Sequence, residues 1–430
     1  MTTSVQRLQD FIDAAPTSWQ AAEEIEKRLK AASFQPLSEL HPWKLQKASR
    51  YYVRRQGAII AFLVPEKKSE SALVFATHTD SPTLKLKPHP LMKKEGMTFL
   101  TFEVYGSPML SSWQGKDLYL AGSALIEKEG ALQLVGVALD DTLLLIPQLP
   151  IHLDREAQEK QATLNRQEHI KALLSIEASC ENPIEFLIQK KIGPCKVISY
   201  DLYACAKEKS SLIGEKRELI SSSRIDNLFS ASACLAALED YKEASSTTLQ
   251  MAVFYDHEEI GSRTKEGAYS PFFDDVLTRI SLSLEISNEQ TLIIKNRSLC
   301  LSIDMAHAFN PLFENKYEPG HKALLGEGVC IKYNADHKYA TSAFTSGWLI
   351  HRCSALQIPL QPFIARSDIG CGSTVGPIFS HKTGIATVDI GAAQLSMHSC
   401  REVASVKDYL DLIRLIKGCM DVELTLPTTC

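Results

Sequence analysis

The stretch Asp256-His257-Glu258-Glu259-Ile260-Gly261 indicates the fold most directly. It follows the apolar run Leu249–Tyr255 and ends in a glycine, a pattern typical of a buried strand that stops at the rim of a sheet. Two adjacent glutamates at such a rim point in different directions, so one can bind a metal ion while the other handles a proton. Adjacent acids are also common on solvated helices, so this stretch alone leaves both interpretations open.

The same pattern, an apolar run followed by residues of metal-ligand type, occurs three more times. The runs are 71–77 before His78-Thr79-Asp80, 299–303 before Asp304-Met305-Ala306-His307, and 383–390, which leads through Gly391 to Met397-His398-Ser399. In open α/β sheets, functional sites gather outside the carboxyl ends of the strands. Four strands that deliver His, Glu, Asp and His to one edge therefore indicate a metal centre.

Helices and strands alternate in two parts of the chain that flank a strand-rich segment. Strands are expected at 57–64 and 72–77, and from residue 224 onward helices such as 226–241 and 341–356 alternate with strands such as 248–256 and 299–304. Between them, short strand-like pieces show no such alternation. We therefore expect an α/β protein with a mixed-sheet sandwich domain at 1–84 and 221–430, and an inserted strand-rich second domain at 85–220.

Composition excludes several classes of protein. Hydrophobic residues make up 45% and charged residues 23% of the 430-residue chain, as in ordinary globular proteins. The net charge of -5 argues against a nucleic-acid surface, and no apolar run reaches the roughly 20 residues needed to span a bilayer. Eleven cysteines without a CxxC pair indicate unpaired thiols, so a reducing compartment, the cytoplasm, is expected.

The candidate metal ligands are His78, Asp226, Glu259, Asp304 and His398, with Glu258 left as a free carboxylate. Asp80, two residues after His78, is suited to orient its ring, because a metal-bound imidazole usually donates its second N–H to a carboxylate. This mixture of donors suits zinc, with Co²⁺ or Mn²⁺ as substitutes. Two such cations can activate a water molecule and polarise a carbonyl, a combination that hydrolyses amides.

Each of these residues also has a plain structural interpretation. Asp226 stands where an ordinary helix N-cap would stand, Asp304 can be a buried capping acid, and His398 can be a core or surface histidine. Considered one at a time, these interpretations remain open.

Six motifs in order along the chain resemble the aspartyl aminopeptidase family of dizinc aminopeptidases. They are HTDSP, SRIDN, DHEEIGS, DMAHA, GCGSTVGP and MHSCRE, and the segments YGSPMLSSWQGKDLYLAG and IPQLPIHLDR in the middle of the chain are similar to family segments too. The resemblance covers nearly the whole chain. It implies a metal-dependent aminopeptidase that removes N-terminal residues, with Asp or Glu expected, from peptides.

The resemblance also implies roles for single residues. His78 and Asp304 would bind one Zn²⁺, Glu259 and His398 a second, and Asp226 would bridge the two, while Glu258 would be the general base for the attacking water and Asp80 would orient His78. The residues expected near the substrate are His152, His307, Lys332, Asp368, Gly370 and Met397. Among these, His152 would reach the site of a neighbouring subunit, and Lys332 would meet the acidic side chain of the substrate.

The inserted domain is expected to act in oligomerisation or as a lid, and the family implies a homo-oligomer, with a dodecamer as one form. After DMAHA the chain reads Phe309-Asn310-Pro311, where a histidine before the proline would be expected, and related enzymes accept neutral residues. An aminopeptidase of neutral or broad specificity is therefore the first alternative. A catalytically silent assembly protein is the second.

Overall fold

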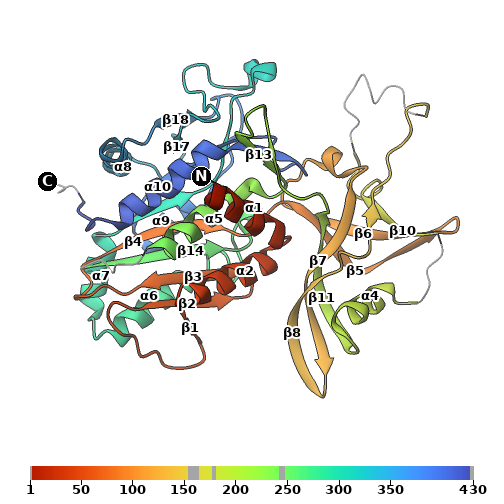
Figure 1. Ribbon diagram of the computed structural model, residues 1–430, viewed down its shortest axis with the longest axis horizontal. Coiled ribbons are helices and arrows are strands. Elements are labelled where there is room, and N and C mark those ends of the chain that lie inside the picture. The colour runs from red at the N-terminus through yellow and green to blue at the C-terminus, as the bar shows by residue number, and fades with distance from the viewer. Residues whose placement is uncertain (1, 154–163, 177–180, 242–246, 427–430) are drawn as a thin grey trace. The chain divides into compact units, whose positions relative to one another are not determined.

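The computed structural model describes residues 2–153, 164–176, 181–241 and 247–426. The chain forms two compact units, each with its own core. Unit 1 consists of Met1–Asp80, Ser211–Met397 and Glu402–Cys430, and unit 2 consists of Ser81–Ser210 and His398–Arg401. Figure 1 shows the elements of both units.

A mixed nine-stranded sheet forms the centre of unit 1. In spatial order its strands are β1 (Gln35–Leu37), β2 (Arg50–Arg55), β3 (Ala58–Leu63), β14 (Thr248–Tyr255), β4 (Ser71–His78), β15 (Leu299–Ile303), β19 (Ala386–Gly391), β17 (Val329–Tyr333) and β18 (Leu360–Ile364). The central strands β14, β4, β15 and β19 run parallel, whereas β3 and β17 pair antiparallel with their neighbours β14 and β19. The predicted α/β class with a mixed sheet is confirmed.

Helices cover both faces of this sheet because its strands are apolar on both sides. In β14, Ala252 and Phe254 belong to one hydrophobic core, and Met251 and Val253 belong to the other. The first core packs against α1 (Thr2–Ala14), α2 (Ser18–Ala31), α5 (Ile225–Asp240), α8 (Ala343–Leu356) and α10 (Val406–Met420). The second packs against α6 (Phe272–Ser283), α7 (Asn288–Asn296) and α9 (Val375–Thr383). Burial on both faces explains why the sequence shows continuous apolar runs here instead of alternation.

A smaller five-stranded sheet completes unit 1. Its order is β12 (Ser211–Ile213), β13 (Leu219–Ser222), β21 (Glu402–Ser405), β20 (Ala393–Leu395) and β16 (Ala306–His307). Two short 3₁₀ turns also belong to unit 1: η2 (Glu258–Ile260) follows β14, and η3 (Pro311–Lys316) follows β16. Unit 2 therefore ends before residue 211, earlier than the predicted boundary at 220, because β12 and β13 pair in this sheet.

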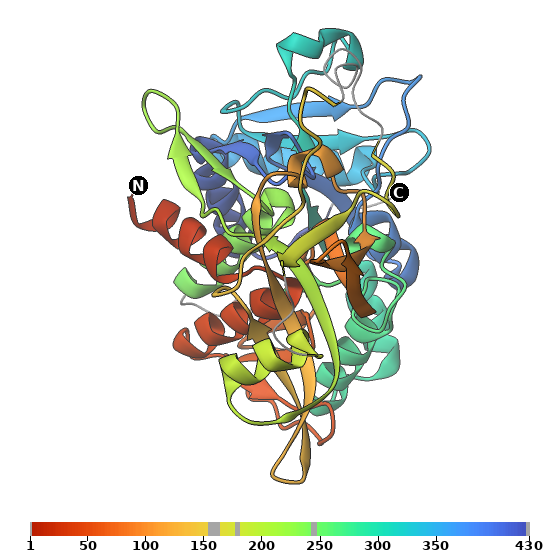
Figure 2. The same ribbon diagram turned by 90° about the vertical axis from the view of Figure 1, so that its right-hand side faces the viewer.

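Unit 2 is built around a seven-stranded sheet that closes on itself. Its order is β11 (Lys196–Ala206), β5 (Thr83–Lys94), β6 (Met97–Tyr105), β10 (Lys171–Ser175), β9 (Leu144–Leu145), β7 (Asp117–Lys128) and β8 (Ala131–Ala138), with β11 also paired to β7. The helix α4 (Pro183–Ile192) and the turn η1 (Leu110–Trp113) complete the unit. Figure 2 shows the orange β7–β8 hairpin beside the yellow-green strand β11.

None of the helices in the described ranges is both long and apolar enough to cross a membrane.

Candidate metal centre

Three neighbouring strands of unit 1 end at one edge of the sheet, and each is followed by or ends in a candidate ligand. β4 ends at His78, opposite Tyr255 at the end of β14, and β15 ends at Ile303, just before Asp304. The strands are parallel and in register, so their carboxyl ends meet. This geometry brings residues 78, 258, 259 and 304 together, as the strand pattern predicts.

The first group of donors consists of His78, Asp226 and Asp304, all buried. His78 Nε2 lies 3.4 Å from Asp226 Oδ1 and 3.5 Å from Asp304 Oδ1. Two ligands that each lie about 2.0–2.1 Å from a tetrahedral Zn²⁺ are separated by about 3.3–3.4 Å. The spacing and chemistry of these donors therefore fit one zinc ion.

The second group of donors joins His78 to Glu258 and Glu259, whose ligand atoms also lie within 4.8 Å of one another. Both glutamates are partly buried in η2, between His257 and Gly261, which have φ values of 63° and 92°. With Asp80, Asp226 and Asp304, five carboxyl groups gather around one imidazole. Such a concentration of negative charge favours the binding of cations.

Asp80 connects the two groups. Its Oδ1 accepts a hydrogen bond from Glu258 N at 3.0 Å, and its Oδ2 accepts one from Glu259 N at 3.1 Å. Asp80 Oδ1 also lies 3.4 Å from His78 Nδ1. The side chain thus contacts the ring of one candidate ligand and the backbone of another, which is more than the orienting role that its spacing predicts.

The pKa of Glu258 is raised well above its usual value. Burial is the largest cause, and the negative charges of Glu259, Asp304 and Asp80 act in the same direction, whereas His78 opposes them. A raised pKa makes a carboxylate a stronger base, which suits a group that takes a proton from water and passes it on.

The start of α5 holds Asp226 in place. Its backbone N–H donates to Glu402 Oε2 at 3.1 Å, and the next residue, Asn227, donates from Nδ2 to the carbonyl of Ile303 at 2.8 Å. The peptide bond between Asp226 and Asn227 is cis. Asp226 has non-helical dihedral angles, and its carboxylate contacts His78, so the geometry favours the ligand interpretation over an N-cap.

Sequence reasoning missed Glu402 and Asn227. Glu402 is 1% exposed and Asn227 is completely buried. Both stand inside motifs that the resemblance quoted, MHSCRE and SRIDN, and membership in those motifs was the available signal.

A cavity of about 440 Å³ lies in unit 1 beside β16, three residues beyond Asp304. His307 and Gly370 line it, as do Lys316 and Arg366. Asp368 binds Arg366 through two hydrogen bonds at 2.8 and 2.7 Å. The cavity therefore gathers two predicted substrate residues, with a third bonded to its wall.

Lys332 has partners inside the protein. It is 2% exposed, and its ammonium donates to the Met305 carbonyl at 2.6 Å and lies 3.6 Å from Asp304 Oδ2. The contact with an acidic substrate side chain stays a prediction.

The remaining candidate residues lie at the end of unit 1 or in unit 2. Met397, the last residue of its segment of unit 1, packs against the first core. His398 begins the segment that clusters with unit 2, where its Nδ1 lies 3.1 Å from the Ser107 carbonyl. His152 is exposed in a turn of unit 2. The roles of His398 as a ligand and of Met397 and His152 near the substrate therefore stay predictions.

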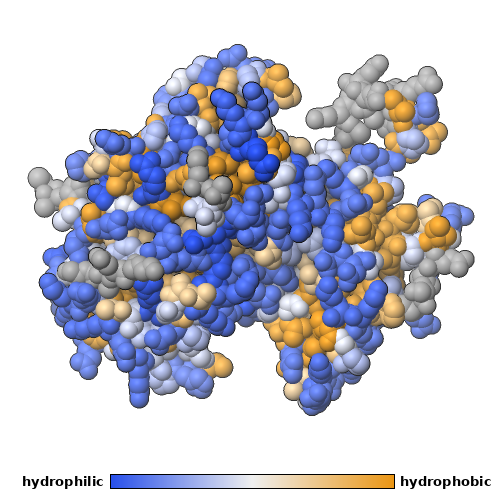
Figure 3. Space-filling view, in the orientation of Figure 1, coloured by the Kyte–Doolittle hydropathy of each residue, from blue (hydrophilic) through white to orange (hydrophobic). Residues whose placement is uncertain are grey.

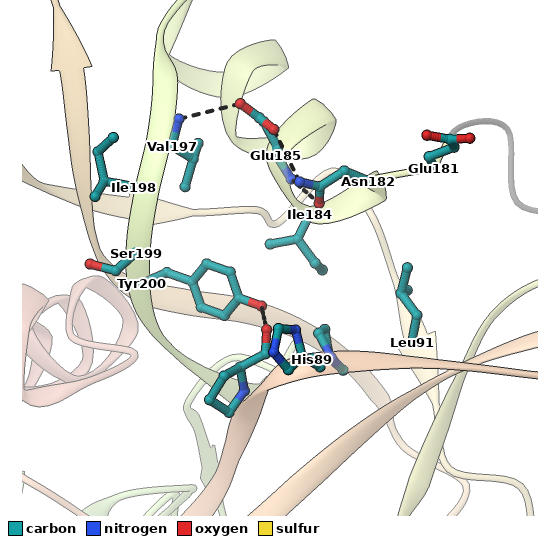
Figure 4. A pocket seen from close by; sticks show the side chains of 12 residues that line it. His89, Leu91, Glu181, Asn182, Ile184, Glu185, Val197, Ile198, Ser199 and Tyr200 are labelled. Atoms are coloured by element: carbon teal, nitrogen blue, oxygen red, sulfur yellow. Dashed lines mark hydrogen bonds between the residues drawn. The ribbon is translucent and has the colours of Figure 1, made fainter.

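Unit 2 contains a cavity of its own, of about 410 Å³. It opens where β5 bulges between Leu86 and Leu91, and Tyr200 of β11 bridges the gap by donating to the Pro88 carbonyl at 3.1 Å. Figure 4 shows the second wall, where Glu185 of α4 accepts from Val197 N. Tyr200 and Glu185 are thus used in contacts within the unit.

Comparison with known proteins gives concordant matches. A model of the family described as aminopeptidase I zinc metalloprotease (M18) matches residues 11–419. A probable M18 family aminopeptidase 2 of Stutzerimonas stutzeri is 37% identical over 96% of each chain, and a probable aspartyl aminopeptidase of Ricinus communis is 33% identical over 93% of this chain and 91% of its own. Among solved structures, a chain of an Ape4 and Nbr1 complex is 32% identical, with a TM-score of 0.91 over 97% of this chain and 85% of its own. A chain of the yeast mApe1 dodecamer is 23% identical, with a TM-score of 0.83 over 97% and 96%.

Proposed function

The chain belongs to the M18 family of aminopeptidase I zinc metalloproteases, and from this premise we propose that it removes N-terminal Asp or Glu residues from peptides with two zinc ions and Glu258 as the general base. The protein is a metallo-aminopeptidase, a hydrolase of peptides. The observation that carries the finer proposal is the meeting of two donor groups that share His78, with Glu258 and Glu259 on one turn.

In this mechanism the chain holds the metal and moves the proton. The ions would be bound by the five proposed ligands, His78, Asp226, Asp304, Glu259 and His398. Bound zinc supplies a Lewis acid that polarises the scissile carbonyl and lowers the pKa of water. Glu258 takes the proton of the attacking water and passes it to the leaving amine, and Asp80 holds the turn that carries Glu258.

The substrate's side chain and the following residues would enter the cavity beside His307. Gly370 in its wall leaves the space next to its backbone open, since a Cβ there would meet no atom within 4 Å. Lys316 and Arg366 give the lining positive charge, although Asp368 offsets that of Arg366. Because Glu318 also lines the cavity, its walls carry charges of both signs, and the acidic preference is supported by the similar protein named a probable aspartyl aminopeptidase.

Zinc content and a panel of peptides test the function. Purified protein should carry zinc, cleave peptides that begin with Asp or Glu faster than those that begin with Leu or Ala, and lose activity on dialysis against a chelator. One specific observation favours the alternative of neutral or broad specificity, namely that Lys332 is already bound to Met305 and Asp304. Equal rates across the panel would support that alternative.

Replacing Lys332 by Ala is expected to lower kcat/KM for Asp and Glu substrates by about 10–100-fold more than for Leu or Ala substrates. The reason is that a hydrogen bond to a charged group contributes about 1.5–3 kcal/mol. Lys316→Ala is the control, because this cation lines the cavity and is exposed, whereas Lys332 is buried beside Asp304. Equal losses of kcat/KM for all substrates would mean that Lys332 holds Asp304 in place and does not contact the substrate side chain.

Unit 2 would join copies of the chain into a homo-oligomer and bring His152 to a neighbouring site. Its surface carries many exposed apolar side chains, such as Leu132, Leu149 and Leu153, with exposed fractions of 65%, 61% and 73%. Figure 3 shows orange residues gathered over the β7–β8 hairpin. Exposed apolar patches mark interaction surfaces, and the similar yeast mApe1 forms a dodecamer.

Mixing inactive subunits tests the shared site. His152→Ala subunits and His78→Ala subunits should each be inactive or impaired, and a mixture that has exchanged subunits should regain part of the activity. Size-exclusion chromatography with light scattering gives the subunit number. Absence of any recovery after verified exchange would contradict a site completed by a neighbour.

We propose the cytoplasm as the compartment of the enzyme. The nine cysteines within the described residues are free thiols, and seven of them are buried, as expected for a reducing environment.

A further inference from the structure

The turn at 256–262 has an unusual backbone. His257, Gly261 and Ser262 have φ values of 63°, 92° and 60°. Residues other than glycine seldom adopt such values, and they persist where the surrounding structure fixes them. Because Glu258 and Glu259 lie between these positions, whatever fixes the turn also aims the two glutamates.

Three consecutive backbone amides of this turn end on two aspartates. Asp80 accepts from Glu258 N and Glu259 N, and Asp256 Oδ1 accepts from His257 N at 2.8 Å. Asp256 is 4% exposed. Where β14 ends, the His257 N–H no longer pairs with a neighbouring strand, and the Asp256 carboxylate accepts its hydrogen bond instead.

The second oxygen of Asp256 is fixed from another element. Asp256 Oδ2 accepts a hydrogen bond from Ser18 Oγ at 2.9 Å, and Ser18 is the first residue of α2. Figure 1 shows α2 beside β2 and β3, against which its apolar residues pack. The turn is thereby tied to a helix that packs into the main core.

Gly57 provides the space for this contact. A Cβ at Gly57 would lie 2.1 Å from Asp256 Oδ2 and 2.9 Å from Ser18 Oγ. The carbonyl of Gly57 also accepts from Thr79 Oγ1 at 2.8 Å, and Thr79 lies between His78 and Asp80. The β2–β3 turn therefore packs behind both aspartates.

We propose that Asp256 is a positioning residue, which together with Ser18 and the space at Gly57 sets the turn that aims Glu258 at the reacting water and Glu259 at the metal. The inference rests on the roles proposed for these two glutamates. Asp256 is not a member of any donor group found among the described residues, so it acts through the backbone of the turn and not on the substrate.

Asp256→Ala is expected to lower kcat by roughly 10²-fold in zinc-saturated enzyme, with KM changed less than about threefold, because a displacement near 1 Å can cost that much. Zinc should also be lost more readily to a chelator. Asp256→Asn should recover most of kcat, since its Oδ1 can accept from His257 N and its Nδ2 can donate to Ser18. Gly57→Ala, which displaces the carboxylate without removing it, should resemble Asp256→Ala.

Asp408→Asn is the matched control. Asp408 is buried like Asp256 and accepts two backbone N–H groups, from Gly326 and Gly328, but it lies at the start of α10. Asp408→Asn should lower the Tm about as much as the Asp256 substitution does, and it should leave kcat unchanged. Hydrogen exchange should show faster uptake in the peptide 256–262 for Asp256→Ala and Gly57→Ala but not for Asp408→Asn.

Normal kcat and normal exchange in Asp256→Ala would overturn the inference, as would a loss no larger than that of Asp408→Asn. If Asp256→Ala does not fold, Ser18→Ala and Gly57→Ala decide by the same measurements. If the wild-type protein cleaves no peptide, the proposed function fails, and the exchange rates and chelator competition still decide whether Asp256 positions the turn.

Discussion

Replacing Glu258 by Gln is expected to lower kcat by about 10²–10⁴-fold, the contribution typical of a general acid–base group. The amide keeps the size and polarity of the side chain but lacks an oxygen that can take a proton. Asp80 binds the backbone and not the side chain of residue 258, so the turn should keep its place. Stopped assays with a peptide substrate and zinc analysis of the same sample measure both quantities.

Glu259→Gln provides the comparison within the same turn. Glu259 is proposed as a ligand, so its replacement should weaken zinc binding at one site, and excess zinc should restore part of the activity. Glu258→Gln should bind zinc normally and should not respond to excess zinc. Near-normal turnover of a fully metallated Glu258→Gln protein would mean that another group is the base.

The ends of strands were the most predictable part of the site. An apolar run that stops at a polar residue is a local signal, and the structure ends β4 at His78, β14 at Tyr255 and β15 at Ile303, close to the predicted positions. Because the strands are parallel and adjacent, local signals at three places in the chain combine into one site.

Contacts between distant segments could not be predicted in this way. Ser18 and Asp256 are 238 residues apart, and Asp226 and Glu402 are 176 apart. Ser18 has the sequence context of an ordinary helix start, and Gly57 that of an ordinary turn. Only the packing of α2 and the β2–β3 turn against the end of β14 gives them a role.

The boundary of the inserted unit was misplaced for a related reason. The segments Ser211–Ile213 and Leu219–Ser222 have the strand-like character of unit 2. In the structure they pair with each other, and Leu219–Ser222 also pairs with Glu402–Ser405 in unit 1. Strand pairing between segments that lie far apart leaves no mark in either segment alone. The nearby start of α5 at Ile225 was predicted closely because a helix start is local.

Replacing Asp226 by Asn is expected to abolish tight zinc binding and to lower activity by more than roughly 10³-fold. Mutating a residue that only hydrogen-bonds to a metal ligand typically costs about 10–100-fold, and the loss of a ligand should cost more. Asp226 contacts the imidazole that both donor groups of unit 1 share, and it is proposed to bridge the two ions. His307→Ala is the control, since His307 lines the cavity but is proposed only to contact substrate. It should raise KM and leave zinc content unchanged.

The Tm of Asp226→Asn relative to that of the wild type should depend on whether zinc is bound. In chelator-treated protein the substitution removes one of five clustered carboxyl groups and thus reduces repulsion among like charges, so the Tm should equal or exceed that of the wild type. Zinc at about 100 times its dissociation constant should stabilise the wild type by about 2.7 kcal/mol, and it should stabilise the variant little. The two unfolding curves should therefore change order when zinc is added. A variant less stable than the wild type in both conditions, by the same amount, would mean that Asp226 serves the packing of α5 and not the metal.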